Sequence, residues 1–181
     1  MRKLTIVTLL TAALLILAGC GSESTGPSQN PGGWNEHNES GFILEWMVND
    51  TTSTLHVRMT APTTGWVAVG FDPQTVMLEA NLIIGYVSGS STELRDDWGT
   101  GQHSHDADTA LGGTDNVTLV EGSETAGETT IEFTIPMDSG DAYDKALVEG
   151  TTYNVILAYG SNGADDFTSS HMWAAVIGLE I

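Results

Sequence analysis

Basic side chains are scarce in this sequence: five Lys and Arg stand against 24 Asp and Glu, a formal net charge of −19 over 181 residues. Charged residues make up only 16% of the chain, so the imbalance comes from missing bases rather than from unusually many acids. Such a chain would repel the phosphates of nucleic acids and of anionic lipids. We therefore expect no nucleic-acid binding, whereas a basic partner, a cation or a small ligand remains possible.

Cysteine is nearly absent as well, because Cys20 is the only one, which excludes an internal disulfide. Residues 1–19 have the pattern of a signal peptide: two basic residues precede an apolar stretch, residues 4–17, that is too short to cross a membrane. The stretch ends in Leu-Ala-Gly-Cys, which resembles a bacterial lipobox and implies cleavage before Cys20 and lipidation of that residue. The alternative is an ordinary secretory signal followed by a chance cysteine.

Lipidation would anchor the protein to the cell envelope on its extracytoplasmic side, since more than one acyl chain gives stable attachment. Gly21 in place of Asp resembles outer-membrane sorting, if the host has such a membrane. Residues 20–33 are rich in Ser, Gly and Pro and predict a flexible tether. Cleavage removes two bases and no acid, so 24 acids and three bases remain, a charge of −21. Residues 34–181 are expected to form one domain.

Long amphipathic helices are also missing from the pattern, which consists of short apolar or alternating segments separated by turn residues. Leu55, Val57 and Met59, for example, are expected on one face of a strand. Gly85 indicates a bulge or a close approach of two backbones. The expected strands predict an all-β sandwich, and they cover residues 43–48, 55–60, 66–71, 81–87, 117–120, 129–135, 153–159 and 171–181.

Residues 96–115 have no strand character and are expected to form a long loop, which in a compact domain is usually functional. Four side chains in this loop could hold zinc or another divalent metal: His103, His105, Asp106 and Asp108. Its acids could equally hold Ca²⁺, although the regular spacing of a calcium loop is missing. A polar loop with internally satisfied side chains is the simpler interpretation.

Several segments, taken in order, resemble the DOMON domain family, and the resemblance covers residues 41–181. The motif TGWVAVGF, residues 64–71, looks like the signature strand of the family. The other matching positions are Met77, residues 81–87, Arg95-Asp96-Asp97, Asp108, residues 129–136, Ser139-Gly140-Asp141, Asp144, residues 157–160 and His171. The resemblance implies an immunoglobulin-like β-sandwich that binds haem or sugars.

In the b-type cytochromes of this family one Met and one His hold the haem iron, and the matching positions here are Met77 and His171. With both axial positions filled by protein, electron transfer is favoured over oxygen chemistry. The aromatic side chains expected to wall the haem are Trp66, Phe71, Tyr86 and Trp173. The haem propionates should lie in solvent or near a base, that is Arg58, Arg95 or Lys145.

Each ligand assignment has a simpler alternative: Met77 could fill a gap in the core, and His171 could be a surface residue of a strand. The apolar residues that alternate with His171 favour a side chain that lines a pocket. The favoured hypothesis is a lipoprotein that binds haem b and exchanges electrons with a separate protein bearing a basic patch. The alternatives are a sugar-binding module and a structural role. No nucleophile motif indicates an enzyme.

Overall fold

The computed structural model describes residues 28–29 and 33–181. The predicted signal peptide (residues 1–19), Cys20 and most of the predicted tether lie outside this part of the chain. Two tether residues, Ser28–Gln29, form strand β1, which pairs with the first strand of the domain. Among the described residues no helix is long and apolar enough to span a membrane.

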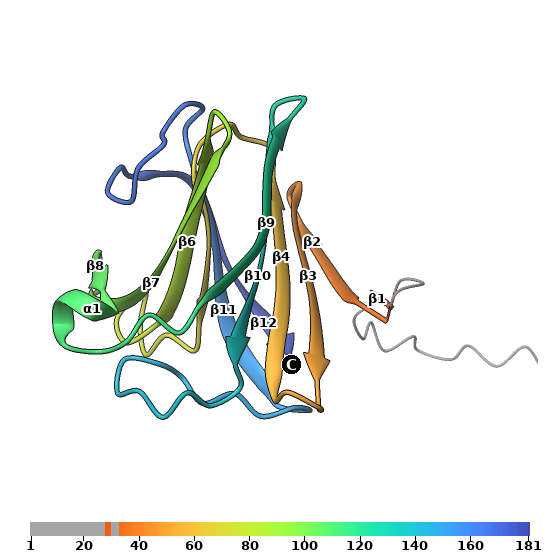
Figure 1. Cartoon of the computed structure of the whole chain (residues 1–181), viewed down its shortest axis with the longest axis vertical. Helices are drawn as coiled ribbons and strands as arrows, with labels where there is room; N and C mark the ends of the chain where they lie inside the picture. Colours follow the sequence, from red (N-terminus) through yellow and green to blue (C-terminus); the bar gives the residue numbers. More distant parts are fainter. Residues whose placement is uncertain (1–27, 30–32) are drawn as a thin grey trace, which may run out of the picture.

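Two antiparallel six-stranded sheets pack face to face, which confirms the predicted β-sandwich (Figure 1). The first sheet has the order β1-β2-β3-β4-β10-β9, and the second has the order β12-β11-β5-β6-β7-β8. The strands of the first sheet beyond β1 are β2 (Asn35–Glu39), β3 (Phe42–Asn49), β4 (Thr54–Ala61), β9 (Thr118–Thr125) and β10 (Glu128–Pro136). Those of the second are β5 (Val67–Phe71), β6 (Asn81–Ser88), β7 (Ser91–Gly101), β8 (Ser104–Ala107), β11 (Thr152–Gly160) and β12 (His171–Glu180).

The core between the sheets follows from the two-residue period of the strands. Leu55, Val57 and Met59 of β4 are completely buried, as their alternation predicts. They face the alternate residues of the second sheet, among them Val69 of β5 and Leu157 of β11. Every strand expected from the sequence is present within a few residues of its predicted bounds.

Three strands of the second sheet are buried on both faces. In β5 all five residues are buried, and most residues of β6 and β11 are as well. One set of side chains fills the core between the sheets. The other set, including Ala68, Ile84 and Ala158, forms a separate apolar cluster on the outer face of the second sheet. A sheet that is apolar on both faces needs a cover on its outer side.

The expectation of a structureless loop at residues 96–115 was wrong. Most of this segment is ordered: β7 runs to Gly101, β8 follows, and the short helix α1 (Asp108–Leu111) comes next. β7 pairs along its length with β6, and Asp97 lies opposite Leu82. The strand was missed because two of its buried residues, Asp96 and Asp97, are acidic. A search for alternating hydrophobic residues does not detect such a strand. Figure 1 shows β8 and α1 together at the edge of this sheet.

Gly85 lies at a close approach rather than at a bulge, because its pairing with both neighbouring strands is regular. A Cβ atom on Gly85 would lie 2.7 Å from Ile131 and 2.8 Å from the backbone oxygen of Glu93. We therefore predict that Gly85→Ala lowers the free energy of unfolding by about 1–3 kcal/mol, the usual cost of overpacking. Urea unfolding followed by tryptophan fluorescence measures this change.

The matched control is Gly178→Ala on β12, because a Cβ atom there meets only a methyl group at an ordinary 3.8 Å. This variant should unfold within about 0.5 kcal/mol of the wild type. Equal stabilities of the two variants would contradict the close packing of the sheets at Gly85.

Candidate functional site

A cavity of about 570 Å³ lies on the outer face of the second sheet. Its floor is made by small and aliphatic side chains of four neighbouring strands, and its rim by the segments that follow β5, β7 and β11. The floor consists of Ala68, Leu82, Ile84, Ile156, Ala158, Ala174 and Val176. The rim includes Val76, Met77, His103, His105, Thr168, Ser169, Ser170 and His171. The volume falls in the range of cofactor and ligand pockets.

Met77 reaches this cavity from the connection between β5 and β6. Its side chain is half-buried and packs against the cluster of Ala80, Leu82 and Ile156. Gly99 of β7 fixes the connection, because it accepts a hydrogen bond from the Glu79 N–H and donates one to the Ala80 carbonyl. A Cβ atom on Gly99 would lie 1.7 Å from the Met77 carbonyl oxygen, so this contact requires glycine.

His171 reaches the same cavity from the first residue of β12. Simple alternation would place it on the same face as Trp173, whose ring packs into the core between the sheets. The pairing of β12 with β11 shifts at this point, because Tyr159 lies opposite Trp173 whereas Gly160 lies opposite His171. The extra residue, Met172, forms a bulge that turns His171 to the outer face.

The two side chains approach the floor from different ends. Met77 packs beside Ile156, and His171 lies opposite Gly160, on the same strand, β11. The two side chains therefore border the same cavity from different ends of β11.

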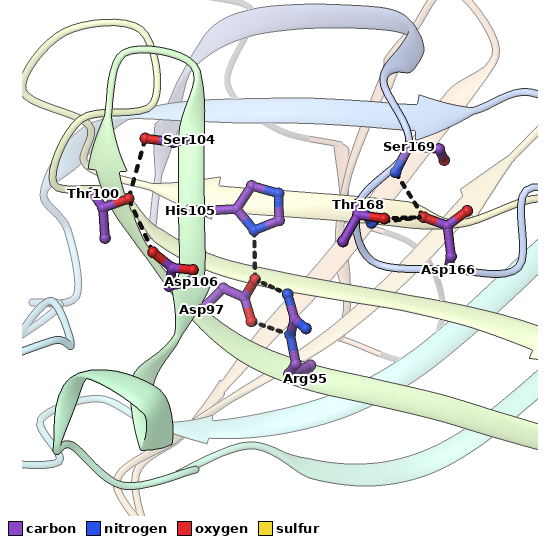
Figure 2. A network of polar contacts seen from close by, with 9 residues as sticks. All are labelled: Arg95, Asp97, Thr100, Ser104, His105, Asp106, Asp166, Thr168 and Ser169. Atoms are coloured by element: carbon purple, nitrogen blue, oxygen red, sulfur yellow. Dashed lines mark hydrogen bonds and ion pairs between the residues drawn. The ribbon is translucent and has the colours of Figure 1, made fainter.

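Trp66 and the segment before β12 form the wall next to His171. The Trp66 indole N–H donates to the Ser169 hydroxyl at 2.9 Å. The Asp166 carboxylate accepts from the N–H groups of Thr168 and Ser169, both at 2.6 Å, as Figure 2 shows. These bonds lower the pKa of Asp166. Asp166 thus stabilises the turn that precedes His171.

A charged network adjoins the cavity through His105 (Figure 2). Arg95 donates two hydrogen bonds to the Asp97 carboxylate, at 2.5 and 2.6 Å. The Nδ1 atom of His105 lies 2.5 Å from the same carboxylate, which leaves Nε2 on the side away from Asp97. Arg95 also lies 4.4 Å above the ring of Phe167. A carboxylate in this position fixes the orientation of an imidazole.

Asp97 is completely buried, and burial alone would raise its pKa. The hydrogen bonds from His105 and Arg95 outweigh that effect, so the pKa of Asp97 is lower than usual. The carboxylate is therefore ionised at neutral pH and holds Arg95 and His105 in place. The sequence indicated neither this partnership nor the role of Asp97.

The structure corrects part of the expected aromatic wall. Trp66 lines the cavity. Phe71 and Trp173 do not, because the strand period and the bulge turn both rings into the core between the sheets. Tyr86 lies on the outer face but packs on the ring of Phe167, 5.0 Å away, beside the cavity rather than in its lining.

The four loop residues considered as a metal site do not come together. His103 and His105 line the cavity, and His105 binds Asp97. Asp106 is exposed and accepts a hydrogen bond from Thr100. Asp108 is buried elsewhere, next to Asp96 and Asp144.

Of the three bases expected near an anionic ligand group, one lies on the face that carries the cavity. Arg95 pairs across the strands with Ile84, a residue of the cavity floor. Arg58 lies on the other sheet, with Glu45 and Glu132. Lys145 lies 3.6 Å from Asp72.

Two solved structures of similar architecture are cytochrome domains. The cytochrome domain of Myriococcum thermophilum cellobiose dehydrogenase matches with a TM-score of 0.63, over 86% of this chain and 88% of that one, at 12% identity. The cytochrome b domain of pyranose dehydrogenase from Coprinopsis cinerea matches with a TM-score of 0.61, over 81% of both chains, at 15% identity. At these identities the likeness establishes the fold, a β-sandwich of the same kind.

The family follows from the sequence comparison. The DOMON domain model matches residues 38–160, most of the folded domain, and the chain belongs to the DOMON domain family. A mouse (Mus musculus) protein, DBH-like monooxygenase protein 2, is 26% identical over 138 residues, 76% of this chain. The chain spans only 22% of that relative's length.

The network around Asp97 yields a pH-dependent prediction. A carboxyl group whose pKa is lower in the folded state stabilises the fold above its unfolded pKa, about 4, and loses this effect as pH falls through the folded value. Asp97→Asn should cost about 3 kcal/mol at pH 7, because it leaves Arg95 and His105 without their anion. The difference from wild type should shrink below pH 4. Urea unfolding at pH 7 and pH 3 measures it.

Asp106→Asn is the matched control, because Asp106 is an exposed acid on the neighbouring strand β8. Its effect should stay within about 0.5 kcal/mol at both pH values. An Asp97→Asn deficit that is unchanged between pH 7 and pH 3 would show that the ionised carboxylate is not what stabilises the network.

Proposed function

We propose that this protein is a b-type cytochrome that binds haem in the outer-face cavity and transfers electrons. The observation that carries the proposal is that Met77 and His171, far apart in sequence, line one cavity with an apolar floor. The DOMON family and the two cytochrome domains of similar fold support it. When bound, haem supplies a one-electron couple, and Met with His ligation raises its potential.

The residues present fit such a group. Met77 and His171 would hold the haem iron, since a thioether and an imidazole are both suitable ligands for it. The floor between them carries the small side chains Ala68, Ala158 and Ala174, which leave room in the cavity for an apolar group. With both ligands provided by the chain, the iron would have no free position for oxygen, which favours electron transfer.

The same cavity bears the groups that can meet anionic substituents. Arg95 lies on this face, and His103 and His105 are on the rim. Elsewhere the chain is strongly acidic. We propose that the propionates face this side, toward Arg95 and the two imidazoles, because the N–H groups of these side chains can donate hydrogen bonds to carboxylates.

The electron partner and the location belong to the same proposal. We propose that electrons pass to or from a separate protein. A net charge of −19 favours a partner with a basic docking patch. The lipobox-like sequence before Cys20 supports attachment to the cell envelope through lipid.

A sugar-binding role is less well supported by the cavity. Sugar recognition uses accessible aromatic faces, yet Trp66 is only 5% exposed and its N–H is taken by Ser169.

The mouse relative is named as a monooxygenase, but this chain matches only 22% of it, so we propose an electron-transfer module and not an enzyme.

The test is the visible spectrum of the full chain after reconstitution with haem b. We expect a Soret band and, on reduction, the sharp α and β bands of six-coordinate haem. Met77→Ala and His171→Ala should each abolish the sharp reduced bands, because one axial ligand is lost. Thermal unfolding of the haem-free variants checks that each remains folded.

Two controls make the assignment specific. Met47→Ala removes a methionine of β3, and His37→Ala removes a histidine of β2, and both strands belong to the other sheet. Both should keep the wild-type spectrum. A protein that stays colourless after reconstitution would refute the cytochrome proposal. Loss of the sharp bands in His105→Ala but not in His171→Ala would instead identify His105 as the ligand.

A further inference from the structure

Three carboxylates meet at the edge of the second sheet, away from the cavity lining. They are Asp96 of β7, Asp108 of α1 and Asp144 of the connection between β10 and β11. One oxygen from each lies within 4.8 Å of the others. Asp96 and Asp108 are 2% and 0% exposed, and Asp144 is half-buried. Such a concentration of negative charge needs a counter-charge or protons.

Four buried oxygen atoms at this place have no hydrogen-bond partner among the described residues. They are both carboxylate oxygens of Asp108, Oδ1 of Asp96 and the side-chain carbonyl of Asn81. Asn81 is itself 2% exposed, and its amide nitrogen donates to Asp144 at 2.8 Å, so its free oxygen belongs to the same group of side chains. Buried acceptors without donors are rare in native proteins, and each calls for an explanation.

No base of the described chain supplies the missing positive charge. The Lys and Arg residues there are Arg58, Arg95 and Lys145. Arg58 pairs with Glu45 and Glu132, Arg95 with Asp97, and Lys145 with Asp72. The unpartnered oxygens are all acceptors, which excludes an anion and leaves a cation as the suitable ligand.

We propose that Asp96, Asp108 and Asp144, with the Asn81 side-chain oxygen, bind one Ca²⁺ ion that ties β7, α1 and the β10–β11 connection together. Calcium takes six to eight oxygen ligands at 2.3–2.6 Å, so two ligands of one ion are at most about 5 Å apart. The three carboxylate oxygens lie within 4.8 Å of one another, inside this limit. Asp108, both of whose oxygens are unpartnered, can bind through two oxygens, so the four side chains supply five ligands, and a water molecule would complete the six that calcium requires.

Calcium fits this chemistry better than magnesium or zinc. Magnesium keeps several water molecules, whereas these ligands are buried. Zinc prefers nitrogen or sulfur ligands, and all the atoms here are oxygens. The nearest imidazole network, at His105, is bound to Asp97 instead. The second carboxylate oxygen of Asp96 is oriented by the backbone N–H of Asn116, and Asp144 by Ser139, which leaves the carboxylates fixed in place.

The acid–base behaviour of the cluster agrees with this assignment. Burial raises the pKa of Asp96 to about 7 and that of Asp108 to about 8. The neighbouring negative charges of Asp97, Asp115 and Asp141 act in the same direction. A bound divalent cation would offset both the burial of these acids and their mutual repulsion.

The experiment compares the full chain in EGTA and in millimolar Ca²⁺ at pH 8, with melting temperature as the readout. We expect calcium, at about 100 times its dissociation constant, to raise the melting temperature by about 5 °C or more. Terbium gives a second readout, because Tyr143 precedes Asp144 and stacks edge-on with Trp98 at 6.2 Å. Excitation of these rings should sensitise terbium luminescence, and calcium should quench it by displacement.

Asp108→Asn is the decisive variant because it keeps the size of the side chain and removes the charge. It should lose the calcium shift and the terbium signal. In EGTA at pH 8 it should melt at or above the wild-type temperature, since charge repulsion is relieved. Asp106→Asn, an exposed acid two residues away, should keep the full calcium shift.

If Asp108→Asn does not fold, Asp144→Asn serves the same purpose, because that residue is only half-buried. Two results would overturn the proposal. One is a wild-type melting temperature that does not change with calcium. The other is an equal calcium shift in wild type and in a folded cluster variant. Protons shared among the three acids would then be the explanation.

Discussion

The structure depends on one constraint, the burial of β5, β6 and β11 on both faces. Their inner side chains close the core between the sheets, as in any β-sandwich. Their outer side chains, such as Ala68, Ile84 and Ala158, are equally apolar and require cover. The connections before β6 and β12 and the β7–β8 hairpin rise around this outer face without closing over it. The cavity is what remains between them.

Two local irregularities place the proposed iron ligands over this floor. The connection that carries Met77 is held to β7 at Gly99, where a side chain would collide with the backbone. The bulge at Met172 releases His171 from the face that its neighbours occupy. Neither the contact at Gly99 nor the bulge at Met172 is part of the core between the sheets. Their common consequence is that a thioether and an imidazole from opposite ends of the domain face one cavity, which is why we connect them with ligand binding and not with stability alone.

The sequence predicted what depends on local pattern and missed what depends on pairing between distant segments. The alternation in β4 and the apolar run in β5 were sufficient for the strands and for the fold. Met77 and His171 came from the order of motifs in a family. The bulge that separates His171 from Trp173 left no such signal, and neither did the acidic strand β7. β7 is a strand because it pairs with β6, although its composition indicated a loop.

The shortage of bases links the two proposed sites. With only three Lys and Arg in the described domain, each already in an ion pair, buried acids cannot all be neutralised by side chains. Asp97 receives Arg95 and His105, and it is ionised beside the cavity. Its sequence neighbour Asp96 points into a group of acids with no base, and its pKa rises to about 7. The pKa values of these two adjacent residues are thus shifted in opposite directions. Because β7 carries both, a cation that fixes Asp96 would also fix the strand that orients His105 toward the cavity, although the two sites share no ligand.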